Sequence, residues 1–201
     1  NVDGSTSNIL YSAWLGTDPT TNPASQTYIV DDIGANPSIL GYSGYLGAAF
    51  NEAGVNDNVH IYSDDGPTDY EQITDRVLEP NITILSGGSN LYFRRNQIKG
   101  TVTHNGAETA DFLFNHWGSP PSIAGNTGNL LVSPWINTLP GTTSTTYVVD
   151  DLGATPPGGY LYTAFDAADG DDTVEVLTDE DQDDYQDVTG LTITEDVTVP
   201  A

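Results

Sequence analysis

Hydrophobic and polar residues alternate along several short segments of this chain, as they do in β-strands with one buried face. Near the C-terminus one parity is apolar, at Leu191, Ile193, Val197 and Val199. The segments TYVVDD (146–151) and TVEVLT (173–178) are rich in β-branched residues and also predict strands. YLYTAF (160–165) is expected to pair with 173–178 through a hairpin turn at Asp169-Gly170. Because no segment of useful length shows an apolar period of about 3.6 residues, the sequence predicts an all-β protein.

The chain contains an internal duplication. TYIVDDIGANP (27–37) recurs as TYVVDDLGATP (146–156), 119 residues further along, and 44–84 aligns without a gap with 159–199. Upstream of these segments, NILYSAWLGT matches NLLVSPWINT, which begins at Asn129. Self-similarity of this length indicates two copies of one structural unit.

Short strands separated by clusters of Gly, Pro and Asp are typical of β-sandwiches. The predicted architecture is two tandem Ig-like β-sandwiches that arose by the duplication. The expected domains are 1–86 and 87–201, with a linker at about 85–96.

Three segments in this order resemble carboxypeptidase-regulatory-like repeats: IKGTV (98–102), GGYLYTAFDAADGDD (158–172) and DDYQDVTGLTITEDVTV (183–199). The resemblance covers most of 96–201 and, more weakly, 8–84. These repeats are prealbumin-like (transthyretin-like) β-sandwiches of secreted and cell-surface proteins. The resemblance therefore implies the sandwich fold. It also implies modules that adhere, act as spacers or assemble, and that seldom catalyse reactions.

The two copies differ in what precedes them. Residues 85–128 precede the second copy and include an expected opening strand at 98–103 and a surplus apolar run, ADFLFNHW (110–117). Only NVDGSTS precedes the first copy, so its sandwich is expected to lack an opening strand and to expose an edge. A strand from a neighbouring copy would cover that edge and build a filament, because a head-to-tail contact that does not close propagates. Alternatively, the surplus run packs within the same chain, or the first copy closes with fewer strands.

The charge balance limits the kinds of partner that this protein can bind. Asp and Glu number 29 against 4 Lys and Arg, for a net charge of −25. Such a surface excludes nucleic acid and anionic lipid as partners, because both require Lys and Arg to neutralise phosphate. The hydrophobic content of 37% favours a folded chain over a disordered one. At molar salt the Debye length falls to about 3 Å, so the negative charges on facing surfaces barely repel one another. The composition therefore predicts a protein of a halophile.

The chain has no Cys and no Met. The lack of Cys excludes disulfides and thiolate sites. The lack of Met means that Asn1 is not a translation start, so we expect a chain processed by removal of a signal peptide and located outside the cell or on its surface. No apolar run approaches about 18 residues, so no membrane span is expected.

Acidic loops of the second copy are the candidate metal ligands, because calcium takes about six to eight oxygens from flexible loops. The candidates are Asp166, Asp169, Asp171, Asp172, Asp179, Asp181 and Asp183. The stretch 179–183 departs from an EF-hand, since Asp184 stands where that loop requires Gly. Solvated acidic loops are the alternative interpretation. Asn81 begins an N-x-T motif and is the candidate glycosylation site.

Three of the four cations cluster between the copies, close to the surplus apolar run. The candidate assembly residues are Arg94, Arg95, Lys99, Phe112, Phe114 and Trp117. The cations are expected to pair with acidic loops of the other copy or of a neighbouring subunit. His60, His104 and His116 share no ligand spacing, and the sequence contains no recognisable catalytic constellation.

These features predict a non-enzymatic structural subunit of an extracellular filament, which binds other copies of itself by β-strand complementation. Calcium is the expected cofactor. The alternative is a carbohydrate- or surface-binding module of a larger secreted protein, with glycans as partners.

Overall fold

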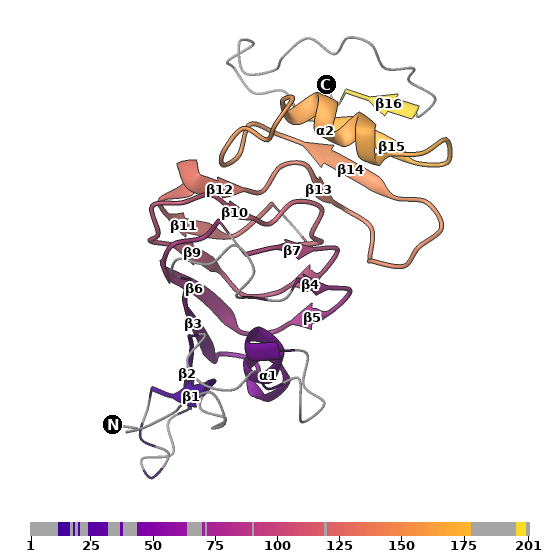
Figure 1. The fold of residues 1–201 in the computed structure, drawn as a ribbon. Helices are drawn as coiled ribbons and strands as arrows, with labels where there is room; N and C mark the ends of the chain where they lie inside the picture. The colour runs from indigo at the N-terminus through magenta and orange to yellow at the C-terminus, as the bar shows by residue number, and fades with distance from the viewer. Residues whose placement is uncertain are drawn as a thin grey trace.

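The computed structural model describes residues 12–16, 18, 20, 24–31, 37, 44–63, 70, 72–89, 91–118, 120–177 and 196–199. These residues form mostly short parallel strands stacked turn upon turn, a β-solenoid of about 5 turns (Figure 1). The structure is mostly strands, but the prediction of an all-β protein is wrong, because two α-helices accompany the strands in these residues. The prediction of two tandem β-sandwiches is wrong, because successive strands pair with the next turn of one stack instead of forming two facing antiparallel sheets.

One face of the solenoid is a six-stranded sheet in the order β1-β2-β3-β6-β9-β11. Its strands are β1 (Trp14–Leu15), β2 (Thr27–Val30), β3 (Asn58–Tyr62), β6 (Asn81–Ser86), β9 (Val102–His104) and β11 (Ile123–Gly125). β1 and β2 are antiparallel, and the other neighbours are parallel. Ile82 pairs with Val102, and Val102 with Ile123, so each turn takes about twenty residues to return to the same face.

The remaining faces contain shorter pairs. They are β4 (Ile73–Thr74) with β7 (Phe93–Arg94), β5 (Val77–Leu78) with β8 (Gln97–Ile98), and β10 (Ala110–Asp111) with β12 (Leu130–Leu131), which follows the 3-10 helix η4 (Thr127–Asn129). Single parallel bridges from Gln97 to His116, and from His116 to Ile136, carry the β5–β8 face onward into the second copy. The predicted domain boundary at residue 86 coincides with the end of β6, and β6 pairs with β9 on the other side of that boundary.

Each turn bends at an equivalent corner. Asp75, Arg95 and Phe114 all have the left-handed backbone conformation there, with φ of 57°, 58° and 59°. Asn96 and Asn115 follow two of these corners and are fully buried. Their stacked side chains bond to the backbone of the adjacent turn, which satisfies polar groups that the bend would otherwise leave unpaired.

The interior of the stack is apolar and aromatic. Phe93 and Phe112, from successive turns, are fully buried and stack with ring centroids 4.4 Å apart. Phe50 packs edge-on against Phe93 at 5.8 Å. The surplus run 110–117 is itself part of a turn, with Phe112 and Trp117 in the core of its own chain.

The duplicated segments have the same structure. The second copy consists of β13 (Trp135–Ile136), β14 (Thr146–Val149), α2 (Tyr160–Ala167), β15 (Thr173–Val176) and β16 (Asp196–Thr198), and these elements repeat β1, β2, α1 (Gly44–Glu52), β3 and β6. In each copy an antiparallel hairpin leads into a helix, which crosses over to a parallel strand. Gly44 is the first residue of α1 and the equivalent Gly159 directly precedes α2, and their φ values are 79° and 95°.

The segment 160–165 forms helix α2, so its predicted hairpin with 173–178 is wrong. Because β14 and β15 are parallel, their connection must cross over the sheet, and a tight hairpin cannot do this. Tyr160 and Ala164 face the core from α2, with exposures of 4% and 0%. The strands predicted from TYVVDD and TVEVLT are confirmed as β14 and β15. Residues 191–195 lie outside the described residues.

Candidate functional site

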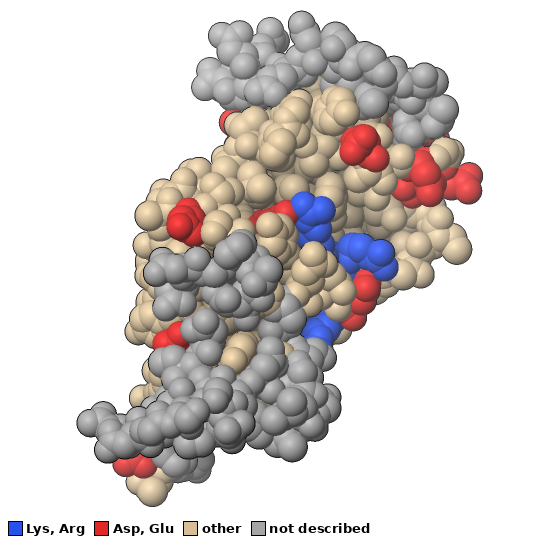
Figure 2. Space-filling model, viewed as in Figure 1, with Lys and Arg blue, Asp and Glu red and all other residues tan. Residues whose placement is uncertain are grey.

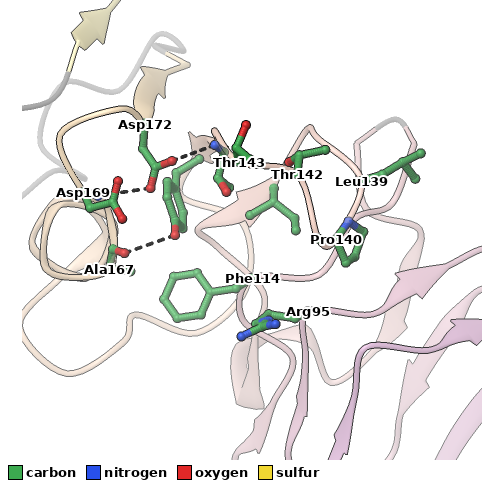
Figure 3. Close-up of a pocket in the computed structure, with 13 residues that line it drawn as sticks. Arg95, Phe114, Leu139, Pro140, Thr142, Thr143, Ala167, Asp169 and Asp172 are labelled. Atoms are coloured by element: carbon green, nitrogen blue, oxygen red, sulfur yellow. Dashed lines mark hydrogen bonds between the residues drawn. The ribbon is translucent and has the colours of Figure 1, made fainter.

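A groove with a volume of about 450 Å³ lies where the corner of the solenoid meets the second copy (Figure 3). Arg95 and Phe114 form its solenoid side, the β13–β14 loop contributes 139–143, and Asp169 and Asp172 come from the turn between α2 and β15. A second cavity of about 370 Å³ adjoins the same phenylalanine and is lined in part by Arg94, Tyr162 and Asp166. The lining of the groove is about equally polar and apolar, and its volume is within the range of small-molecule sites.

Phe114 is the central aromatic residue of the groove. Its ring packs edge-on against Tyr147, with centroids 5.8 Å apart and planes at 89°. The Arg94 guanidinium lies 5.6 Å from the centroid of the same ring, within the range of a cation–π contact. The corner conformation of Phe114 holds the half-buried ring in this position between the solenoid and the second copy.

Asp172 fixes the acidic wall of the groove. The carboxylate is buried and accepts hydrogen bonds from the backbone N–H of Thr145 at 2.6 Å and of Asp169 at 3.0 Å. The first copy repeats this arrangement, because Asp57 accepts from the backbone N–H of Gln26 at 2.7 Å and of Gly54 at 2.8 Å. A role that recurs in both copies identifies Asp172 as a structural clamp between the turn and the hairpin.

Tyr147 is held in the same way as its counterpart in the first copy. Its hydroxyl donates to the backbone carbonyl of Ala167 at 3.1 Å, and the Tyr28 hydroxyl donates to that of Glu52 at 3.3 Å. Burial, together with the carboxylates of Asp172 and Asp169, raises the pKa of Tyr147. The phenol therefore stays protonated over the physiological range and remains a hydrogen-bond donor.

The clustered cations form ion pairs between successive turns. Arg94 pairs with Asp111, Arg95 with Asp75 at 2.8 Å, and Lys99 with Glu79 at 2.7 Å. Figure 2 shows basic side chains together near the middle of one face, with acidic side chains beside them. The pair of Arg95 is largely exposed and contributes little to stability, whereas the Asp111 carboxylate is largely buried. In the described part of the chain these cations therefore join turns of one molecule, and their predicted role in assembly stays a prediction.

The calcium prediction also stays untested. Asp166, Asp169 and Asp171 are exposed, while Asp179, Asp181 and Asp183 lie outside the described residues. Within the described residues, no group of three His, Asp or Glu side chains is placed to hold a metal ion. For the predicted glycosylation site, the Asn81 side chain accepts from the backbone N–H of Thr101 at 3.0 Å, so its amide already links two turns.

The structure brings together residues that the sequence assigned to separate sites. Arg94, Arg95 and Phe114 were expected to act in assembly and Asp169 and Asp172 in metal binding, yet all five line two adjoining cavities. Sequence reasoning missed Tyr147, Tyr162 and the 139–145 loop. The match between Tyr28 and Tyr147 in the two copies was the available signal for Tyr147.

Comparison of the chain with known protein families, with curated proteins and with solved structures finds no match in any of the three. Neither α1 nor α2, the two α-helices in the described residues, is long and apolar enough to cross a membrane.

Proposed function

We propose that this protein is a non-enzymatic structural subunit of an extracellular filament or surface fibre of a halophile. The observation that supports it is the continuity of the stack: parallel pairing joins one turn to the next and runs through His116 and Ile136 into the second copy. An architecture that grows along one axis suits a spacer or fibre, since each turn contacts only its neighbours. The run 110–117 is occupied within its own chain, so strand complementation would use the ends of the stack.

The charge predicts how this assembly depends on salt. With a net charge of −25, copies repel one another at low ionic strength. At molar salt the Debye length of about 3 Å removes most of this repulsion. We therefore expect filaments in multimolar NaCl and dispersed subunits after dilution, as seen by electron microscopy and light scattering.

Two controls make this test specific. Dilution into an equal concentration of KCl keeps the ionic strength and should preserve the filaments. Addition of EDTA at constant salt asks separately whether calcium holds them together. Uniform monomers in every salt condition would contradict the proposed function.

The groove supports a second candidate function, the binding of a neutral oligosaccharide. Phe114 offers an aromatic surface for the apolar face of a sugar ring, and threonine hydroxyls and Asp169 offer hydrogen bonds around it. A neutral ligand avoids the repulsion that this acidic surface would exert on anionic glycans.

Replacement of Phe114 with asparagine tests this second candidate. Asparagine tolerates the left-handed corner, so the variant removes the ring without straining the backbone. Against a panel of neutral oligosaccharides, calorimetry should show affinity reduced at least about tenfold, a loss of about 1.4 kcal/mol. Val55→Ala, at an exposed residue outside the groove, is the control. Equal affinity of wild type and Phe114→Asn for a bound sugar would exclude the groove as the site.

A further inference from the structure

The duplication supplies an internal comparison for both ends of the solenoid. Each end strand has a counterpart in the middle of the same chain, where another turn covers it. β16 corresponds to β6, and β1 corresponds to β13. The covered counterpart therefore shows what kind of neighbour each end strand fits.

At the C-terminal end, β16 and the residue that follows it expose side chains whose counterparts are in the core. Val197 and Val199 are 49% and 59% exposed, whereas the equivalent Ile82 and Ile84 are both 0% exposed. Val197 lies in register with the fully buried Val174, so it occupies an inward-facing position of the sheet.

The neighbour that buries the counterparts is a parallel strand. β9 pairs with β6 in parallel, with Ile82 opposite Val102 and Ile84 opposite His104. In the part of the chain that the structure describes, no strand occupies this place beside β16, which is the last strand of its sheet. The outer edge of β16 therefore fits one further parallel strand.

At the N-terminal end, β1 shows the same difference. Leu15 is 39% exposed, whereas the equivalent Ile136 is 5% exposed. Ile136 is covered by the preceding turn, through a parallel bridge to His116 and a 3.0 Å hydrogen bond from its N–H to the carbonyl of Asn115. Among the described strands, none lies on the outer edge of β1.

We infer that β16 of one copy pairs in parallel with β1 of a second copy. β6 is covered by the parallel strand β9, and β13 is covered by the parallel bridge from Ile136 to His116, so β16 and β1 each fit a parallel neighbour of the kind that the other strand provides. The contact buries Val197, Val199 and Leu15 together and pairs the outer edges of β16 and β1, which no strand of the described residues covers. It joins different surfaces of the two copies, so it repeats head to tail and extends a fibre unless the rotation closes a ring. This inference rests on the proposed function and names the surfaces that carry it.

Single-end variants test the pairing. Val197→Asp blocks the β16 end and Leu15→Asp blocks the β1 end, and both change exposed side chains, so the fold should persist by circular dichroism. Each variant alone should stay monomeric in multimolar salt, with the critical concentration for polymerisation raised at least about tenfold. Val77→Asp is the matched control, because Val77 is 53% exposed in β5, away from both end strands, and it should polymerise like the wild type.

Mixing the two variants gives the decisive result. Leu15→Asp keeps an intact β16 end and Val197→Asp keeps an intact β1 end, so an equimolar mixture should form one-to-one dimers and nothing longer, by analytical ultracentrifugation. Dimers of Leu15→Asp alone would show symmetric β16–β16 pairing and would overturn the inference.

The remaining outcomes separate the inference from the proposed function. Wild-type filaments that persist in both variants would retain the filament function and reject these surfaces. If the wild-type protein stays monomeric in high salt, both the inference and the proposed function are contradicted. The end strands would then bind a partner other than a second copy.

Discussion

Replacing Asn115 with alanine is expected to lower the free energy of unfolding by about 4 kcal/mol. The side chain is fully buried and joins two turns at the corner of the solenoid. Its amide nitrogen donates to the carbonyls of Phe93 at 2.6 Å and Phe112 at 2.8 Å, and its oxygen accepts from the backbone N–H of Asn96 at 2.8 Å. Alanine would leave all three backbone groups buried without a partner, each at a cost of about 1–3 kcal/mol.

Urea denaturation of the dispersed subunit, at the same salt concentration for every variant, measures this loss. Asn137→Ala is the matched control, because Asn137 is exposed, and it should change stability by less than about 0.5 kcal/mol. Asn96→Ala alone and combined with Asn115→Ala completes a double-mutant cycle. The two side chains are bonded to each other at 3.1 Å, so the losses should not add. If the two losses of stability were simply additive, the two asparagines would not act as one hydrogen-bonded unit.

Replacing Phe112 with alanine should destabilise the fold by about 3–5 kcal/mol. The ring is fully buried and stacked on Phe93, with planes only 10° apart, so its removal leaves a cavity between two turns. Phe112→Leu retains much of the apolar volume and should cost considerably less. Thermal unfolding of the dispersed subunit measures both variants.

This experiment also separates the core role of Phe112 from the assembly role predicted from sequence. If Phe112→Ala kept wild-type stability and lost only the ability to polymerise, the residue would act at an interface. The structure leads us to expect the reverse, a loss of stability in dispersed subunits.

Local elements were predictable where one residue pattern favours one structure. The β-branched runs of TYVVDD and TVEVLT form β14 and β15 as expected. YLYTAF was misassigned because aromatic residues also favour strands. The helical spacing was nevertheless present twice: apolar residues at Tyr45, Leu46, Ala49, Phe50 and Ala53 recur at Tyr160, Leu161, Ala164, Phe165 and Ala168.

The solenoid was missed because alternation identifies a strand without identifying its partner. A sandwich and a solenoid both contain short strands separated by turns. The distinguishing signal is a spacing of 19 residues, which separates Phe93 from Phe112, Asn96 from Asn115, and Gly87 from Gly106. The last spacing has a steric cause, since a Cβ on Gly106 would collide with the carbonyl oxygen of Gly87. The much longer duplication drew attention away from this shorter period.

The groove was beyond sequence reasoning for a related reason. Arg95, Phe114 and Asp169 each stood out by residue type. Their proximity depends on how the second copy continues the stack through His116 and Ile136, and no local pattern specifies that step.

The direction of the backbone hydrogen bonds between turns has a mechanical consequence. They run along the solenoid axis, so tension applied to the two ends of a fibre would pull on them directly and open turns one after another. Neighbouring turns are about 4.8 Å apart, whereas the twenty or so residues of one turn extend to about 65–70 Å when pulled straight. Each opened turn would thus lengthen the fibre more than tenfold locally while the covalent chain stayed intact. A surface fibre made of such turns would absorb a sudden load by unwinding, as an extensible tether does, and would shorten again when the turns refolded.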